Sequence, residues 1–262
     1  MLKKLQCFQE IETGLHLKMK IIAIGGGEIG KPGTKIETRK IDEESIRLTG
    51  KKHPKLLFIP TASSDSESYY QTVQNYFGKI LGCKTDVLYL TQKPTNQEIR
   101  EKILNTDIIY VGGGNTLKML KIWRRLGVDK VLEEAAEKDV VLSGVSAGAI
   151  CWFKYGNSDS KGKSNLIKVR GLEFIDLMAC PHYDVEKSRR PSLRKMIKYN
   201  GGLALALENC SALEVIGDIY RVLTSSKDAR IYRVYRLYGK VVEEELPIDG
   251  KFRPLELLKL PK

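Results

Sequence analysis

Residues 140–153 read VVLSGVSAGAICWF, and residues 144–148 within them match the pattern G-x-S-x-G. The β-branched run at the start predicts a buried strand at residues 140–145, and the small residues that follow predict the first turn of a helix. A serine on such a tight strand-to-helix turn is exposed for nucleophilic attack. Ser146 is therefore a candidate nucleophile, and the alternative is that it only caps the helix.

Before this turn, short β-branched runs alternate with longer segments of helical period. Strands are expected at residues 20–24, 56–60, 86–90 and 108–111, and helices at residues 41–48, 64–81, 96–104, 115–126 and 128–138. Repeated strand-then-helix order is typical of a mostly parallel sheet with helices on both faces. The sequence therefore predicts a doubly wound α/β fold.

After residue 151 the pattern changes. Residues 155–171 are polar and lack periodicity, which predicts a surface loop. A helix is expected near residues 188–199, and strands at residues 176–180, 202–207, 212–216, 220–224 and 231–238. The last strands are close together and predict antiparallel hairpins near the C-terminus. Residues 1–18 differ from the rest and are expected to form an N-terminal extension, which leaves residues 19–262 as a single α/β domain.

The composition is that of an ordinary globular protein, with 42% hydrophobic and 29% charged residues among 262. The longest apolar stretch without a charge, residues 140–153, is too short to cross a bilayer, and we expect no signal peptide. The five cysteines are scattered and contain no C-x-x-C pattern. We therefore expect a cytoplasmic protein without a metal site.

A serine nucleophile needs a base, and the sequence contains three histidines. His16 and His53 lie in polar segments, whereas His182 follows an apolar strand within the sequence CPHYD at residues 180–184. Loops at the carboxyl ends of strands form the sites of open α/β sheets. Together with Ser146, this placement favours His182 as the base over a purely structural histidine.

The third member of such a triad is a carboxylate that orients the imidazole. Glu208 follows the apolar run at residues 203–207 and so lies at a strand end, where a carboxylate requires a partner. Asp184 and Asp176 are the alternatives. On strand-end placement we favour Glu208.

Two further glycine-rich turns follow expected strands. In GGGNT at residues 112–116, the glycines let backbone N–H groups approach a ligand, so Gly113 or Gly114 is expected to form an oxyanion hole with Ala147. The alternative is a tight turn with a helix cap. GGGEIG at residues 25–30 matches the dinucleotide fingerprint, but no helix follows it, so we expect no nucleotide cofactor.

These motifs together resemble peptidase family S51, which contains aspartyl dipeptidase (peptidase E) and cyanophycinase and has the class I glutamine amidotransferase-like fold, a flavodoxin-like arrangement. The matching segments are IIAIGGGEIG at 21–30, FIPTASSDS at 58–66, IIYVGGGNTLKML at 108–120, LSGVSAGAICWF at 142–153 and CPHYD at 180–184. The likeness is closest to the peptidase E-like branch. It implies a triad of Ser146, His182 and Glu208. Related amidotransferases have cysteine at the elbow, so the serine here argues against glutamine hydrolysis.

The resemblance also implies hydrolysis of dipeptides with an N-terminal aspartyl residue through an acyl-enzyme, without a cofactor. A cationic pocket for the aspartyl carboxylate is then expected. Its candidate residues are Arg189, Arg190 and Arg194 after His182, with Asn115 in the glycine-rich turn. The alternative for the arginines is a solvated basic helix face. Another acidic peptide or acyl substrate is the alternative for the reaction.

The charge balance suggests a different class of function. The chain has 44 Lys and Arg against 32 Asp and Glu, a net charge of +12, which favours polyanion binding. The basic pairs are dispersed, however, and no nucleic-acid-binding motif accompanies them. We therefore expect a small peptide as the partner, no specific nucleic acid, no membrane, and a monomer or homodimer.

Overall fold

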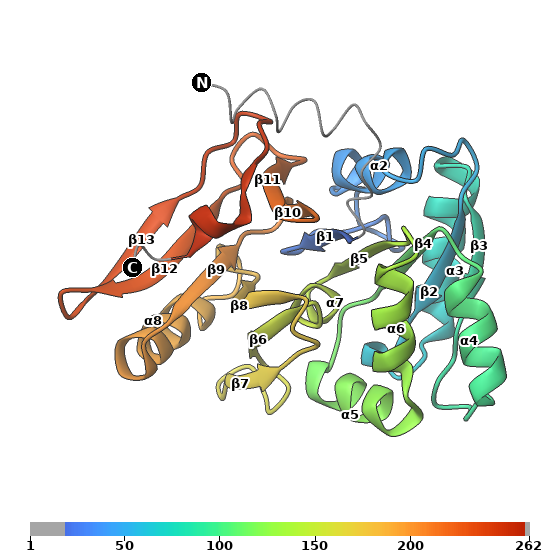
Figure 1. Ribbon diagram of the computed structural model, residues 1–262, viewed down its shortest axis with the longest axis horizontal. Helices are drawn as coiled ribbons and strands as arrows, with labels where there is room; N and C mark the ends of the chain where they lie inside the picture. The colour runs from blue at the N-terminus through green and yellow to red at the C-terminus, as the bar shows by residue number, and fades with distance from the viewer. Residues whose placement is uncertain (1–18, 260–262) are drawn as a thin grey trace.

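The strands form two mixed sheets in this computed structural model, which describes residues 19–259 (Figure 1). The expected N-terminal extension, residues 1–18, lies outside the described residues. The first sheet contains β1 (Lys20–Ile24), β2 (Lys55–Ile59), β3 (Lys84–Val87), β4 (Ile108–Val111), β5 (Val141–Val145), β10 (Ser211–Ile216), β11 (Ile219–Thr224) and β14 (Arg253–Pro254). The second contains β6 (Phe153–Ser158), β7 (Ile167–Arg170), β8 (Ile175–Pro181), β9 (Leu203–Leu207), β12 (Ile231–Leu237) and β13 (Lys240–Glu245).

The first sheet is the doubly wound part of the fold. Its strand order is β14-β11-β10-β1-β5-β4-β2-β3, and the strands from β1 to β3 in this order run parallel to one another. β10, β11 and β14 extend the sheet with antiparallel pairs. This arrangement confirms the predicted α/β class, with antiparallel strands contributed by the C-terminal part of the chain.

Helices cover both faces of the first sheet. Successive residues of a strand point to opposite faces, so alternate residues pack in different clusters. Ile21 and Ala23 of β1 belong to one buried cluster, and Ile22 and Ile24 belong to another. The first cluster includes residues of α4 (Asn96–Leu104), α5 (Thr116–Leu126) and α6 (Val128–Ala136); the second includes residues of α2 (Arg39–Arg47), α3 (Glu67–Val73) and the π-helical turn η2 (Gln74–Ile80). Burial on both faces explains why the central strands, such as β1 and β4, are almost entirely apolar.

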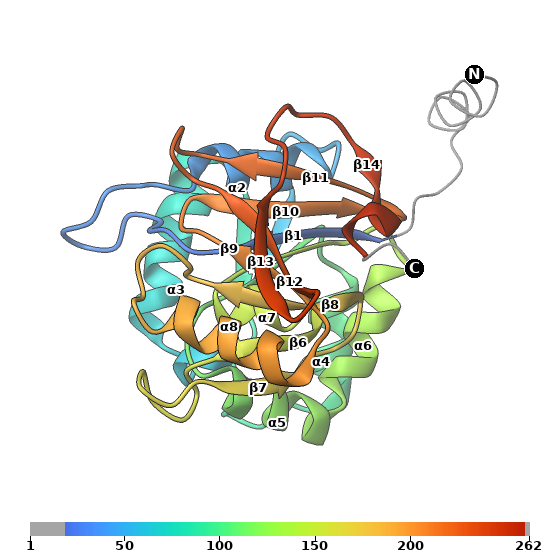
Figure 2. The same cartoon turned by 90° about the vertical axis from the view of Figure 1, so that its left-hand side faces the viewer.

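The second sheet has the order β13-β12-β9-β8-β6-β7 and lies beside the first, as Figures 1 and 2 show. Alternate side chains of β8 point to opposite faces of this sheet and pack in different clusters. Leu177 and Ala179 join the main core, whereas Met178 and Cys180 pack with α8 (Arg189–Asn200). The sheet is therefore held between the main core and α8. No helix within residues 19–259 is long and apolar enough to cross a membrane.

The surface loop predicted at residues 155–171 is correct only for residues 159–166, because the residues on either side belong to β6 and β7. Asn157 and Ser158 are buried in β6 although they are polar. Asn157 Nδ2 donates a hydrogen bond to Ser192 Oγ at 2.9 Å, and Ser158 Oγ donates to Thr116 Oγ1 at 3.2 Å. Because the Asn157 side-chain nitrogen and the Ser158 hydroxyl find partners in neighbouring elements, polar residues are tolerated here and the strand carries no apolar period that sequence analysis could detect.

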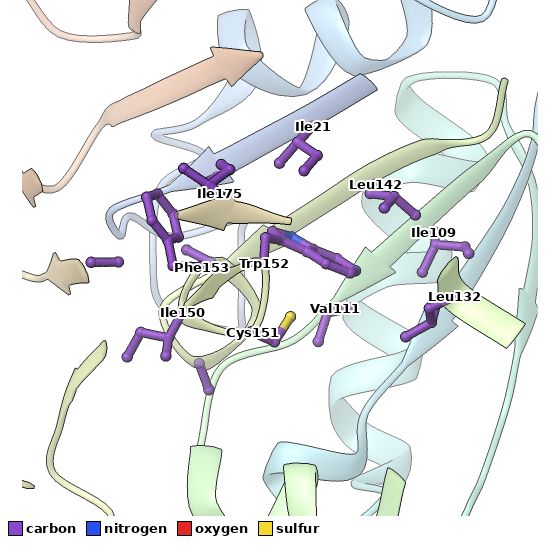
Figure 3. Packing of buried hydrophobic residues seen from close by; sticks show 14 of the residues in the cluster. Ile21, Ile109, Val111, Leu132, Leu142, Ile150, Cys151, Trp152, Phe153 and Ile175 are labelled. Atoms are coloured by element: carbon purple, nitrogen blue, oxygen red, sulfur yellow. The ribbon is translucent and has the colours of Figure 1, made fainter. Parts of the chain in front are cut away.

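The expected helix after Ser146 is also shorter than its apolar sequence suggests. α7 comprises only Ala147–Ile150, and Trp152 and Phe153 then continue into the core. Figure 3 shows Trp152 among Val111, Leu142 and Ile175 of the surrounding strands. These side chains come from both sheets, so the segment after the turn joins the two sheets in one core.

A buried carboxyl lies between α2 and η2. Asp42 is fully buried, and its Oδ2 accepts hydrogen bonds from Thr38 Oγ1 at 2.6 Å and from Tyr76 Oη at 2.9 Å. Its other oxygen, Oδ1, has no partner among the described residues. Burial raises the pKa of Asp42 to about 7, despite the two hydrogen bonds that lower it.

This carboxyl predicts a pH-dependent stability. The folded protein retains a proton on Asp42 that the unfolded chain releases near pH 4, so Asp42 destabilises the fold progressively as pH rises from about 4 to 7, by at most about 4 kcal/mol. Urea unfolding of the wild type and Asp42→Asn across pH 4–8 measures this effect. The difference between their unfolding free energies should change with pH; parallel curves would contradict the prediction.

Candidate active site

Ser146 lies on a strained turn between β5 and α7, with φ of 58° and ψ of −110°. The turn requires small residues around it. A Cβ on Gly144 would lie 2.5 Å from the Gly148 carbonyl oxygen, and a Cβ on Gly148 would overlap the carbonyl oxygen of Val111. This strand-turn-helix geometry matches the context that a nucleophile elbow requires, and its strain is typical of functional sites.

His182 directly follows β8 and also has a strained backbone, with φ of 78°. Its Nδ1 lies 2.9 Å from Oδ1 of Asn209. Burial is the main cause that lowers the pKa of His182, and the Asn209 hydrogen bond and the nearby carboxylates of Glu186 and Asp159 oppose it. A neutral imidazole with one nitrogen oriented by a partner is the form that a general base needs.

The turn at Gly25, Gly26 and Gly27 brings these two residues to one end of the fold. The amide of Ser146 donates a hydrogen bond to the carbonyl of Ile24 at 3.1 Å. Two residues further on, a Cβ on Gly26 would overlap Asn209 Oδ1 and lie 2.5 Å from His182 Nδ1. The absence of a side chain at Gly26 thus leaves space for the imidazole of His182 and for the side-chain amide of Asn209. Among the described residues, no hydrogen bond joins Ser146 to His182.

The structure places Glu208 in a different contact from the one expected. Its Oε2 accepts a hydrogen bond from the Arg230 amide at 2.8 Å, and burial raises its pKa. Of the alternatives, Asp184 Oδ1 accepts a hydrogen bond from the Asn209 amide at 2.9 Å, and Asp176 pairs with Lys154 at 2.7 Å. Sequence reasoning missed Asn209, although its position directly after a strand-end acid was an available signal.

The GGGNT turn lies next to Ser146. A Cβ on Gly113 would be 3.3 Å from Ser146 Cβ and 3.8 Å from its Oγ, whereas a Cβ on Gly114 would overlap the carbonyl oxygen of Ala62 in η1 (Thr61–Ser63). Gly113 is therefore nearer to the nucleophile than Gly114. Ala147, the other candidate oxyanion donor, directly follows Ser146 in the chain.

Tyr69 of α3 is a second residue that the sequence analysis did not single out. Its hydroxyl accepts a hydrogen bond from the Gly113 amide at 3.5 Å, and burial raises its pKa to about 12. The phenol therefore stays protonated at neutral pH. Tyr69 also lines a cavity of about 570 Å³ together with Lys31, Ser66 and Asn75.

The expected substrate-binding side chains all have protein partners. Arg189 is buried and pairs with Glu186 at 2.5 Å, and both Arg190 and Arg194 pair with Glu243. Asn115 Oδ1 accepts a hydrogen bond from the Lys118 amide at 2.9 Å and so caps α5. Arg190 and Arg194 nevertheless line a cavity of about 580 Å³ beside Tyr183, the residue after His182.

Comparison with known proteins decides the family. The model of peptidase family S51 matches residues 21–223. The chain belongs to this family. It is 36% identical to an uncharacterized peptidase, YgaJ, of Bacillus subtilis over 87% of this chain and 97% of that protein. It is 26% identical to peptidase E of Streptomyces coelicolor over 76% of this chain and 84% of that protein. We therefore describe the protein as a family S51 peptidase.

Solved structures support the fold of this S51 peptidase. A peptidase from an acI-B1 actinobacterium superposes with a TM-score of 0.69 at 19% identity, covering 90% of this chain and 96% of that one. A putative peptidase E from Listeria monocytogenes superposes with a TM-score of 0.60 at 20% identity, covering 79% of this chain and 99% of that one. At these identities the likeness supports the peptidase E-like fold, with its class I glutamine amidotransferase-like architecture.

Gly26→Ala tests the geometry of the site. The added Cβ would displace the imidazole of His182 and the amide of Asn209, and a shift of about 1 Å in a catalytic group lowers activity about 10²-fold. Peptidase assays and thermal unfolding measure the effect. Gly78→Ala is the matched control, because a Cβ there finds ordinary contacts of 3.5 Å or more. Unchanged activity in Gly26→Ala would contradict this geometry.

Proposed function

We propose that the protein is a serine peptidase that hydrolyses dipeptides with an N-terminal aspartyl residue through an acyl-enzyme. One observation carries the proposal: Ser146 occupies a strained elbow against Gly113, its amide donates to the carbonyl of Ile24 at the end of β1, and Gly26, two residues further on, adjoins His182. A nucleophile, a base and backbone donors at one strand end are the components of acyl transfer. The family membership supports the same reaction class.

In the proposed mechanism, His182 Nε2 removes the proton from Ser146 Oγ as Oγ attacks the peptide carbonyl carbon. The amides of Gly113 and Ala147 stabilise the developing oxyanion, and the substrate oxygen replaces the Tyr69 hydroxyl at Gly113. His182 then gives its proton to the leaving amine, and the acyl group of the substrate remains bound to Ser146 Oγ as an ester. Water, deprotonated by His182, attacks the ester carbon, and His182 returns the proton to Ser146 Oγ as the ester C–O bond breaks and the acid is released.

For the acidic side chain of the substrate, the cavity beside Tyr69 is our preferred location. Tyr69 contacts Gly113, which adjoins Ser146, and the Lys31 ammonium lies 5.3 Å from the centre of the Tyr69 ring. Lys31 is about half exposed, and its partner Glu28 lies 3.3 Å away. Its ammonium can therefore exchange that surface partner for a substrate carboxylate. The cavity at Arg190 and Arg194 is the alternative location.

Hydrolysis of Asp-Leu by the wild type and Ser146→Ala tests the reaction. Removal of the nucleophile should lower kcat by about 10⁴-fold or more, and His182→Ala should have a similar effect because the two residues act as one unit. Circular dichroism checks that both variants fold. A Ser146→Ala enzyme that retains wild-type turnover would exclude the serine mechanism, and a wild type inactive on Asp-Leu would exclude the dipeptide substrate.

Lys31→Met tests the specificity. Loss of a charge-assisted hydrogen bond, about 1.5–3 kcal/mol, should raise KM for Asp-Leu by about tenfold or more and leave KM for Ala-Leu nearly unchanged. Arg190→Met is the matched comparison on the other cavity. An increase in KM for Asp-Leu in Arg190→Met but not in Lys31→Met would move the acidic subsite to the cavity after His182.

A further inference from the structure

The Nδ1 atom of His182 faces an amide. Asn209 Oδ1 lies 2.9 Å from it, whereas the Glu208 carboxylate accepts its hydrogen bond from the Arg230 amide. Glu208 and Asn209 are consecutive residues, but only the Asn209 side chain contacts the imidazole, and the Glu208 side chain points to the Arg230 amide. The side chain next to the imidazole is therefore neutral.

The backbone on both sides of Asn209 is held in place. The Asn209 amide donates a hydrogen bond to Asp184 Oδ1 at 2.9 Å, and the Cys210 amide donates to the Gly26 carbonyl at 2.9 Å. The side chain occupies the space that a Cβ on Gly26 would fill. Two backbone hydrogen bonds and the close approach of Gly26 thus hold the side-chain amide of Asn209 beside the imidazole, as expected of a positioning group.

We propose that Asn209 is the positioning residue of His182: its Oδ1 accepts a hydrogen bond from Nδ1–H and keeps the imidazole in the tautomer with an unprotonated Nε2. In this tautomer Nε2 can accept the proton of Ser146, which is the role given to His182 in the proposed function, and the inference rests on that function. Asn209 replaces Glu208 as the group that orients the base. An Asn in this place fixes the tautomer without adding a negative charge.

This arrangement has a consequence for the pH dependence of the reaction. The charged groups that face His182 are Glu186, Arg189 and Asp159, and Asp184 lies behind Asn209. The first three are partly neutralised by their own ion pairs. Burial lowers the pKa of His182, so the acid limb of kcat/KM is expected below the ordinary histidine value of about 6.5.

The tautomer can be measured without a substrate. The chain contains three histidines, so ¹H–¹⁵N correlation spectra of the ¹⁵N-histidine-labelled full chain, assigned with His182→Gln, resolve the ring of His182. At pH 8 the proton is expected on Nδ1. A proton on Nε2 would mean that the amide donates to the ring instead of accepting, and this result would overturn the proposal.

Substitutions then separate Asn209 from Glu208. Asn209→Ala should mix the tautomers and lower kcat for Asp-Leu within the range that general-base catalysis contributes, about 10²–10⁴-fold. Asn209→Asp, which preserves the shape, should restore a single Nδ1–H tautomer and move the titration of His182 and the acid limb up by about 1–3 pH units. Thermal unfolding checks each variant, and Asn209→Asp serves if Asn209→Ala does not fold.

Glu208→Gln is the matched comparison, because it changes the neighbouring side chain of the same strand end. It should leave the tautomer of His182 as in the wild type. If Glu208→Gln mixes the tautomers and Asn209→Ala and Asn209→Asp do not alter the ring, the proposal is overturned. Failure of the proposed function would differ from this: the wild type would not hydrolyse Asp-Leu, while the Nδ1–H tautomer and its dependence on Asn209 persist.

Discussion

The close approach of backbones at the carboxyl ends of β1, β4 and β5 is the constraint on which the site depends. Gly144, Gly148 and Gly26 each lie where a Cβ would meet a neighbouring backbone or side-chain atom. With glycine at these positions, the Ser146 turn can pack against Val111, and the imidazole of His182 can lie against the end of β1. Larger residues would separate these segments, and the candidate catalytic groups with them.

The second sheet supplies the groups that complete the site. β8 ends at His182, and β9, its parallel neighbour, leads into Glu208 and Asn209. Two parallel strands end at the same edge of a sheet, so these residues meet although 27 positions separate His182 from Asn209. The core around Trp152 joins this sheet to the first and thereby holds His182 at the same end of the fold as the Ser146 turn. Packing of the two sheets thus sets the geometry of the candidate site.

Sequence analysis predicted the site as far as local patterns extend. The elbow at Ser146 and the strand-end position of His182 follow from residues adjacent in the chain, and the structure has both. The polar strand β6 escaped prediction because Asn157 Nδ2 and Ser158 Oγ donate hydrogen bonds to side chains of α8 and α5, which are distant in the sequence. The partner of Arg190 and Arg194 escaped prediction because Glu243 belongs to β13 and lies about 50 positions away.

The sequence by itself determined the α/β class, the alternation of strands and helices that gives a mostly parallel sheet, and the family, because hydrophobic period and short glycine motifs are local properties. Only the tertiary structure decided which strand-end side chain faces His182. Glu208 and Asn209 are neighbours on one strand end, and their directions depend on the Arg230 amide, on Asp184 and on the space beside Gly26. These contacts come from three separate segments of the chain, so no pattern within one segment encodes them.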